Sequence, residues 1–296
     1  MASIDICICT FRRPFLTETL RSVARLDAGG HDVRVIVADN DETPSARKRV
    51  QGMLDEMPFA TTYLHAPAAN ICIARNACLD AASGDFLAFI DDDETVSEGW
   101  LLALLDKARS EKASAVLGPV RAIYPPEAPD WMTEGDFHST LPVYVNGTIR
   151  TGYTCNVLMR WHAPLRGLRF DTRLGRSGGE DTDFFYRLRA MGGTIAYAPD
   201  AVVAEPVTAQ RATMAWLVQR RLRFGQTHGM LMSGSRFRAM PKVAAKIAYC
   251  GAMTGLTVLS PVARRRNWLR AMLHIGVASS LLGHRTAEHY GQPTAS

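Results

Sequence analysis

The stretch FLAFIDDDET, residues 86–95, runs from an apolar segment directly into three consecutive aspartates. A short apolar run of this kind is typical of a strand that is buried on both faces of a parallel sheet. Asp91, Asp92 and Asp93 should then emerge at the carboxyl end of that strand. Because open α/β sheets bind their ligands at this edge, residues 86–95 predict both a fold class and a binding site.

The three aspartates predict a bound cation, because adjacent carboxylates repel one another when no positive charge lies between them. Carboxylate oxygens are hard ligands that suit Mg²⁺ or Mn²⁺, often shared with a phosphate-bearing substrate. If the strand geometry continues, Asp91 and Asp93 point to one side and Asp92 points to the other. The alternative is a solvated turn that also caps the helix predicted from Ser97.

Strand-like and helix-like segments alternate on both sides of this stretch. The predicted strands are residues 4–9, 33–38, 60–65, 86–90 and 114–120, and the predicted helices are residues 14–26, 45–56, 70–82 and 97–112. This alternation is typical of βαβ units and predicts an α/β fold with a mostly parallel central sheet.

The second half of the chain continues this domain and then becomes helical. A hairpin with an Asn146-Gly147 turn, a strand-like segment at 151–159 and a helix opening at Gly178 follow a Pro-rich passage. We expect one α/β domain over residues 1–230 and a basic, amphipathic helical tail over residues 231–296.

The composition is that of an ordinary globular protein, with 47% hydrophobic and 21% charged residues. Six cysteines occur singly in apolar runs, which favours buried thiols in a reducing compartment over a zinc site or a disulfide scaffold. The opening MASIDICICT lacks the features of a signal peptide, so we expect a cytoplasmic protein. No G-x-G-x-x-G follows the first strand, which argues against a Rossmann oxidoreductase.

The two ends of the chain carry opposite net charge. Residues 1–205 have a net charge of −7, whereas residues 206–296 have a net charge of +12. Between Pro206 and Ala287 there are 13 Lys or Arg residues and no Asp or Glu. Such a block indicates a nucleic-acid arm or a segment on an anionic membrane, and sparse aromatic residues argue against nucleic acid.

The apolar content of the tail favours the membrane. The run from Ile247 to Ala263 has 17 uncharged residues. A helix that spans the membrane needs about 20 apolar residues, so this run is shorter. Arginines and Trp268 flank the apolar stretches that follow, as in a helix that lies in a membrane interface. We therefore expect a protein peripheral to the inner face of the plasma membrane; the alternative is that these helices pack as ordinary core.

Other polar side chains end neighbouring strands. Thr10 and Phe11 end the first strand, and Asp39 ends VRVIVAD, where it could hydrogen-bond a base or a ribose. Arg75 lies in NICIARNACL at a predicted helix start, where the helix dipole favours a phosphate. The alternative for Arg75 is a surface salt bridge.

The segment SGGEDTDF provides two further carboxylates. Glu180 and Asp181 follow two glycines at a predicted helix start, where either could act as a base. The alternative is N-terminal capping, which acidic residues often provide.

Taken in order, these motifs resemble glycosyltransferase family 2, whose members have the GT-A fold. The resemblance covers about residues 4–230 and rests on the ordered occurrence of several short motifs. They are TFRRP at 10–14, VADN at 37–40, ARN at 74–76, FIDDDE at 89–94 and GGED at 178–181. Within the family, the chain is similar to bacterial enzymes that assemble exopolysaccharides.

The resemblance implies a nucleotide-sugar donor, which we expect to be UDP-glucose. It assigns donor binding to a set of side chains around the strand ends: Thr10, Phe11, Arg13, Asp39, Arg75, Asp91 and Asp92. It implies Mn²⁺ or Mg²⁺ on Asp93 and Asp91, with Asp181 as the base and Glu180 beside it.

This assignment agrees with the chemistry of sugar transfer. An acceptor hydroxyl has a very high pKa, so a carboxylate must take its proton as it attacks the anomeric carbon. The metal and nearby cations would neutralise the departing nucleotide. One displacement of this kind inverts the anomeric centre and gives a β-linked product from an α-linked donor.

The chain departs from the family pattern at two places. Glu205 stands where many relatives have a histidine, so a third metal ligand there is a speculative assignment. The signature Gln-x-x-Arg-Trp of processive members is not met, because Gln219 is followed at the third position by Leu222. We therefore expect one sugar to be added per acceptor, and we expect the acceptor to be a lipid diphosphate-linked oligosaccharide.

Two other function classes fit part of the sequence. Residues 91–95 match D-x-D-x-T, the nucleophile motif of haloacid-dehalogenase-like phosphatases that depend on Mg²⁺. That motif normally lies on the first strand, whereas here other βα units precede it. The second alternative is a non-catalytic membrane protein that binds a nucleotide sugar and does not need Asp181.

Overall fold

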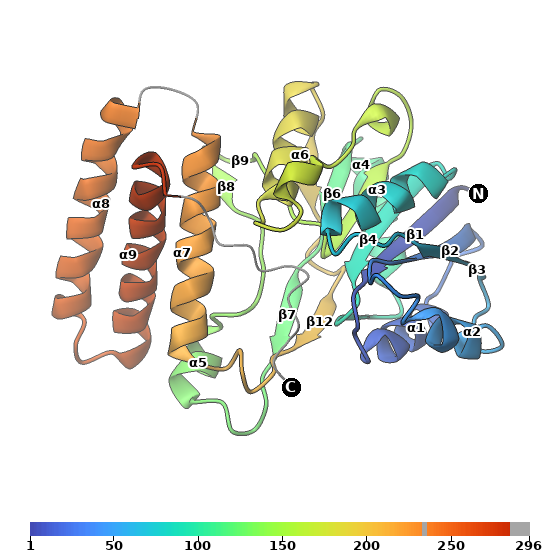
Figure 1. Ribbon diagram of the computed structural model, residues 1–296, viewed down its shortest axis with the longest axis horizontal. Helices are drawn as coiled ribbons and strands as arrows, with labels where there is room; N and C mark the ends of the chain where they lie inside the picture. Colours follow the sequence, from blue (N-terminus) through green and yellow to red (C-terminus); the bar gives the residue numbers. More distant parts are fainter. Residues whose placement is uncertain (233–235, 285–296) are drawn as a thin grey trace.

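A seven-stranded sheet forms the centre of the α/β part of the chain in the computed structural model, which describes residues 1–232 and 236–284 (Figure 1). Its strand order is β11-β6-β10-β4-β1-β2-β3. The strands are β1 (Ser3–Thr10), β2 (Asp32–Asp39), β3 (Ala60–His65), β4 (Phe86–Asp91), β6 (Ala115–Leu117), β10 (Asn156–Arg160) and β11 (Ile195–Tyr197). Only β10 runs antiparallel to its neighbours in this sheet of the described residues, so the predicted mostly parallel sheet is confirmed.

The register of the three middle strands brings their polar ends together. Thr10 of β1 pairs with Asp39 of β2, and Cys9 of β1 pairs with Asp91 of β4. The side chains of β4 before Asp91 are buried on both faces, as the apolar run 86–90 predicts. The candidate residues of these strands therefore share one edge of the sheet.

Helices cover both faces of this sheet (Figure 1). They are α1 (Leu16–Ala24), α2 (Arg47–Met53), α3 (Ile71–Ala81), α4 (Trp100–Ser110) and α6 (Glu180–Ala190). Helices α1, α2 and α4 pack on side chains such as Ile6 and Ala88, whereas α3 and α6 pack on their sequence neighbours Cys7 and Phe89. Successive side chains of a strand point to opposite faces, which explains why consecutive residues belong to separate cores.

A smaller sheet, in the order β5-β12-β7, adjoins the end of β4. Its strands are β5 (Thr95–Val96), β12 (Val203–Pro206) and β7 (Val120–Ile123). The predicted single strand 114–120 is wrong, because the chain breaks at Gly118 between β6 and β7. A Cβ at Gly118 would collide with the carbonyl of Ala201 and the side chain of Asn156, which itself donates to the Ala201 carbonyl.

The remaining short elements lie between β7 and α6. They are α5 (Asp130–Gly135), β8 (Tyr144–Val145), β9 (Thr148–Ile149) and two 3-10 helices, Leu165–Gly167 and Thr172–Leu174. The predicted hairpin with an Asn-Gly turn is confirmed, since β8 pairs with β9 and both Asn146 and Gly147 have positive φ.

Three long helices form a layer beside the α/β part (Figure 1). They are α7 (Met214–Leu231), α8 (Arg236–Leu256) and α9 (Pro261–Leu281), and α9 lies between the other two. Glycines bring α7 and α9 close together, because a Cβ at Gly225 would collide with the carbonyl of Leu273 and one at Gly276 with that of Leu222. The boundary predicted at residue 230 falls at the end of α7, which packs against α9.

The uncharged run 247–263 does not form one helix. It covers the end of α8, a turn at residues 257–260 and the start of α9, where the Ser260 hydroxyl accepts from the backbone of Ala263. Within residues 1–232 and 236–284, no helix is both long enough and apolar enough to cross a bilayer. All six cysteines lie in this part of the chain and are free thiols, five of them buried.

Candidate active site

Asp92 ties the ends of β1 and β4 together. Its Oδ2 accepts from the Thr10 hydroxyl at 2.7 Å and from the Phe11 backbone N–H at 3.3 Å. Burial, together with the charge of Asp93, raises the pKa of Asp92 to about 6. The structure thus places Thr10, Phe11 and Asp92 side by side, with the Asp92 carboxylate engaged by β1.

The chain leaves strand geometry directly after Asp91, where β4 ends. Asp92 and Asp93 therefore do not point to opposite sides, and both lie near the Arg13 guanidinium, at 3.6 Å and 3.4 Å. The alternation predicted for the three aspartates is wrong for this reason. The structure instead groups Asp93 with a cation from the loop after β1.

Asp93 and Glu205 share a second arginine. The Arg211 guanidinium is 3.3 Å from Oδ2 of Asp93 and 2.6 Å from Oε1 of Glu205. The antiparallel pairing of Ala204 with Thr95 brings β12 beside the residues that follow the aspartates. Burial raises the pKa of Glu205, with the charge of Asp93 acting in the same direction and that of Arg211 opposing it.

Asp91 faces a different set of groups. Its backbone N–H donates to Glu94 at 2.8 Å, and ligand atoms of Asp91, Glu94 and Cys155 lie within 4.8 Å of one another. Burial raises the pKa of Asp91 to about 8, and Arg75 opposes this shift. The sequence analysis did not single out Glu94 or Cys155, although Glu94 directly follows the aspartates in the quoted stretch.

The donor set fits a hard divalent cation. Asp91 and Glu94, whose oxygens lie within 4.8 Å of each other, and Asp93 and Glu205, which share Arg211, offer carboxylate oxygens, which suit Mn²⁺ or Mg²⁺. The two arginines at Asp93 show that this carboxylate lies in a position where positive charge is favourable. The Cys155 thiol is a soft ligand and does not fit such an ion, so the carboxylates are the candidate ligands.

Arg75 joins α3 to the start of α6. Its Nη1 donates to Glu180 Oε1 and to Asp181 Oδ1, both at 2.7 Å, and its side chain is 7% exposed. The prediction that Arg75 lies at a helix start is wrong, because α3 begins at Ile71 and Arg75 lies in its second turn. The alternative of an ion pair is correct, but the pair is buried.

Asp181 is also held by Thr154, which the sequence analysis missed. The Thr154 backbone N–H and hydroxyl both donate to the Asp181 carboxylate, at 3.1 Å. Gly179, at φ 95°, precedes the helix and turns the chain so that Asp181 faces Arg75. Burial and the charge of Asp181 raise the pKa of Glu180, whose Oε2 is buried without a hydrogen-bond partner among the described residues.

Asp39 is fully buried at the end of β2 and already has three donors. Its carboxylate accepts from the Tyr63 hydroxyl and the Ala46 backbone N–H, both at 2.8 Å, and from the Asp41 backbone N–H at 3.1 Å. The structure therefore places Asp39 at the predicted edge, with its oxygens bonded within the protein.

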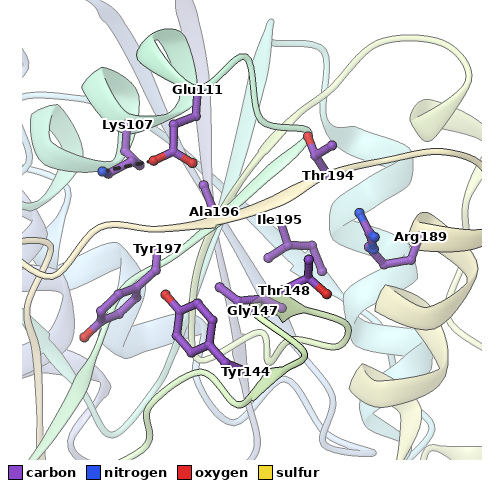
Figure 2. Close-up of a pocket in the computed structure, with 11 residues that line it drawn as sticks. Lys107, Glu111, Tyr144, Gly147, Thr148, Arg189, Thr194, Ile195, Ala196 and Tyr197 are labelled. Atoms are coloured by element: carbon purple, nitrogen blue, oxygen red, sulfur yellow. Dashed lines mark hydrogen bonds and ion pairs between the residues drawn. The ribbon is translucent and has the colours of Figure 1, made fainter.

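A separate hollow of about 460 Å³ lies at the far edge of the sheet, beside β11 (Figure 2). Tyr144 of the hairpin and Tyr197 of β11 lie near each other on one side, and the Lys107–Glu111 pair lies on another. None of the residues predicted for catalysis or donor binding lines this hollow.

Residues 5–163 match the profile of the family described as Glycosyl transferase family 2. The chain is also 55% identical over 295 residues to succinoglycan biosynthesis protein ExoM of Rhizobium meliloti strain 1021, covering 97% of this chain and 96% of that protein. The chain belongs to glycosyltransferase family 2.

Other proteins that this chain resembles have lower sequence identity to it. The GalNAc(5)-diNAcBac-PP-undecaprenol beta-1,3-glucosyltransferase of Campylobacter jejuni is 32% identical over 114 residues, covering 36% of this chain and 35% of that enzyme. Among solved structures, mannosyltransferase PcManGT from Pyrobaculum calidifontis with GDP-Man and Mn²⁺ has a TM-score of 0.63 at 18% identity, covering 95% and 87% of the two chains. TarS 1–349 of S. aureus with UDP-GlcNAc has a TM-score of 0.53 at 15% identity, covering 98% of each chain.

These glycosyltransferase structures confirm the predicted GT-A fold. Family membership also sets aside the phosphatase interpretation of residues 91–95, since this segment begins at the end of β4 rather than on the first strand. The matched residues 5–163 contain the three aspartates, whereas Asp181 and Glu205 lie beyond them.

Proposed function

We propose that this chain is an inverting glycosyltransferase that moves one sugar, expected to be glucose, from a UDP-sugar to a lipid diphosphate-linked oligosaccharide during exopolysaccharide assembly. The observation that carries this proposal is the meeting of Asp181 with the carboxylates of the β4 edge. The Thr154 backbone N–H donates to Asp181 at 3.1 Å, and the thiol of the next residue, Cys155, lies within 4.8 Å of carboxylate oxygens of Asp91 and Glu94.

The names of two relatives support the pathway and the acceptor class. ExoM acts in succinoglycan biosynthesis, and the Campylobacter enzyme is a glucosyltransferase named for an undecaprenol-linked diphosphate. We extend both properties to this chain as part of the proposal.

Asp181 is the proposed base. Arg75 and Thr154 fix its carboxylate from two directions, so it can receive the proton of an acceptor hydroxyl without first reorienting. Glu180 shares Arg75 and lies beside it. Attack from this side in a single displacement inverts the anomeric centre.

Donor binding is proposed at the ends of β1, β2 and β4. Thr10, Phe11 and Arg13 lie around Asp92, and Asp39 forms the wall at the end of β2. Arg13 lies beside two aspartates, where it can also contact a donor diphosphate.

A divalent cation is proposed on Asp93 and Asp91, with Glu205 as the third ligand. When bound, Mn²⁺ or Mg²⁺ stabilises the negative charge that develops on the departing nucleoside diphosphate. Arg211 already pairs with Asp93 and Glu205, so it can stay beside the ligands as a further positive charge.

The helical tail, residues 231–296, is the proposed membrane-associated part beside a catalytic domain at residues 1–230. Apolar side chains at the α8–α9 turn are open to solvent: Leu256 is 77% exposed and Leu259 is 96% exposed. Lys242 and Lys246 are exposed on α8. Together these features support docking on the anionic inner face of the plasma membrane.

The helix expected to lie in the membrane interface does not have that position. Helix α9 packs between α7 and α8 and buries side chains such as Leu269 and Val277. Leu256 at the end of α8 and Leu259 in the turn are more exposed than Trp268 of α9, which is 44% exposed. We therefore assign membrane contact to α8 and the turn.

The test of this function is calorimetric binding of UDP-glucose, UDP-galactose and GDP-mannose, with and without Mn²⁺. The proteins are the wild type and Asp93→Ala, which removes one proposed ligand. We expect binding of a UDP-sugar that requires Mn²⁺ and is lost in Asp93→Ala. No nucleotide-sugar binding by the folded wild type under either condition would overturn the proposal.

A further inference from the structure

The segment QRRLRF, residues 219–224 of α7, carries three arginines, Arg220, Arg221 and Arg223. Arg220 is partly buried and donates to the His138 carbonyl at 3.0 Å and to the Thr140 hydroxyl at 3.3 Å. Its guanidinium also lies 5.2 Å from the ring centre of Trp216. Within the described residues, no carboxylate pairs with Arg220.

Arg211 connects this region to the β4 edge. Its guanidinium lies 5.8 Å from the same Trp216 ring and pairs with Glu205 and Asp93. Arg223 follows Arg220 by three residues and therefore lies on the same face of α7. We call Arg220 and Arg223 the α7 arginine cluster; Arg211 precedes this helix and is already paired with Asp93 and Glu205.

The positive charge of the cluster is not balanced by nearby carboxylates of the described residues. Burial lowers the pKa of Arg220; Glu205 opposes that shift, and Arg211 acts with it. Glu205 is itself already paired with Arg211 at 2.6 Å. Burial and the charge of Arg211 also lower the pKa of Arg223, which forms no hydrogen bond or ion pair in the part of the chain that the structure describes.

Partial burial of a positive charge without a counter-ion costs free energy. An anion that binds several such charges offsets this cost. The guanidinium fork matches phosphate oxygens in two-point hydrogen bonds. A diphosphate carries enough charge and enough acceptor oxygens to satisfy several forks. The chemistry of the α7 arginine cluster is therefore that of a phosphate-ester site.

The reaction supplies two diphosphates, one on the donor and one on the lipid-linked acceptor. Arg13 and the proposed metal ligands lie where the donor diphosphate would bind, at the ends of β1 and β4. Arg220 and Arg223 instead lie on α7, which packs directly on α9 in the layer that carries the exposed apolar turn. This position favours the acceptor.

We propose that the α7 arginine cluster binds the diphosphate of the lipid-linked acceptor and so positions its sugar hydroxyl toward Asp181. The proposal rests on the proposed function for the class of acceptor. It assigns Arg220 and Arg223 a binding role separate from that of the donor site.

The experiment measures two ligands in metal-defined buffers: farnesyl diphosphate without divalent metal, and UDP with Mn²⁺. The variants are Arg223→Gln, Arg220→Lys and the control Arg270→Gln, which removes an exposed arginine from α9. Arg220→Lys keeps the charge but loses the fork, and circular dichroism with thermal unfolding identifies any variant that fails to fold.

We expect Arg223→Gln to weaken farnesyl diphosphate binding about tenfold, which corresponds to about 1.4 kcal/mol. Arg220→Lys should weaken it by a similar factor, since both changes remove charge-assisted hydrogen bonds to the diphosphate. UDP binding should change by less than about twofold, and Arg270→Gln should leave both ligands unaffected.

Unchanged farnesyl diphosphate binding in folded Arg223→Gln would overturn the proposal. So would a variant that loses affinity for UDP but not for farnesyl diphosphate, or one that loses affinity for both ligands equally. An absence of UDP binding in the wild type would instead count against the proposed glycosyl transfer. The two failures are therefore distinguishable.

Discussion

Two arginines beside the site, Arg75 on α3 and Arg220 on α7, have opposite surroundings. Arg75 is buried and pairs with two carboxylates, Glu180 and Asp181. Arg220 is partly buried and meets only a carbonyl, a hydroxyl and aromatic rings among its described contacts. The charge of Arg75 is satisfied within the protein, so it can position a base, whereas that of Arg220 is left for a ligand.

The largest effect is expected from removing the base that Arg75 positions. Asp181→Asn should lower kcat by about 10²–10⁴, the usual contribution of a positioned general base, while donor binding is retained. Sugar transfer and calorimetry measure the two quantities. The control is Asp183→Asn on the same helix, where Asp183 pairs with Arg187. Full activity of Asp181→Asn would favour a non-catalytic sugar-binding protein.

A direct comparison of the two arginines is given by their unfolding free energies. Arg75→Met should lower the free energy of unfolding by about 3–5 kcal/mol, because it leaves two buried carboxylates without their cation. Arg220→Met should lose less than about 2 kcal/mol, because it removes hydrogen bonds but strands no partner charge. Urea unfolding measures both. Equal losses would show that the two arginines have the same structural role.

The next largest effect is expected on membrane binding through the α8–α9 turn, which belongs to the same helical layer as α7. Leu259→Asp should lower partitioning onto phosphatidylglycerol–phosphatidylcholine vesicles by about tenfold, since burying a leucine contributes about 1.5–3 kcal/mol. The matched control is Leu54→Asp, at an exposed leucine of the α/β part. Vesicle sedimentation is the measurement, and equal binding of both variants would contradict docking through the turn.

The smallest effect concerns His138, which links the α7 arginine cluster to the Pro-rich loop. Its Nε2 donates to the Arg211 carbonyl, and its Nδ1 contacts the Tyr124 hydroxyl. Burial lowers its pKa, as do the charges of Arg220 and Arg211, while the hydrogen bond to the Arg211 carbonyl and the charge of Asp136 oppose the shift. The unfolded chain therefore takes up this proton first as pH falls.

The stability from this histidine is complete above its unfolded pKa of about 6.5 and is lost as pH falls toward the lower folded pKa. Between about pH 7.5 and about pH 5.5 the wild type should lose up to about 1 kcal/mol more than His138→Gln. Chemical unfolding at the two pH values measures this. His162→Asn, at an exposed histidine, should keep the wild-type slope; an unchanged slope in His138→Gln would contradict the assignment.

The sequence predicted most of the fold because its signals were local. The apolar run 86–90 became β4, residues 60–65 became β3, and the Asn146-Gly147 turn closed a hairpin. The ordered motifs at 10–14, 37–40, 74–76, 89–94 and 178–181 together predicted the family. Strand burial and turn conformation depend on neighbouring residues, so they can be recognised without knowledge of distant contacts.

The errors arose where distant residues decide the local geometry. The strand 114–120 breaks at Gly118 because Asn156 and Ala201 approach it closely. Helix α9 packs between two other helices, as in the alternative to an interfacial position. No local pattern carries these contacts.

By itself, the sequence determined the α/β class, the shared edge of the strand ends and the identity of the carboxylates. Tertiary structure alone decided that Arg75 holds Asp181, that Arg211 joins Asp93 to Glu205 and that Arg220 donates to the His138 carbonyl and to no carboxylate of the described residues. The physical reason is the separation of the interacting residues along the sequence: burial patterns and periodicity depend on residues only a few positions apart. Each charge pair, by contrast, depends on which separate loops and helices meet at the edge of the sheet.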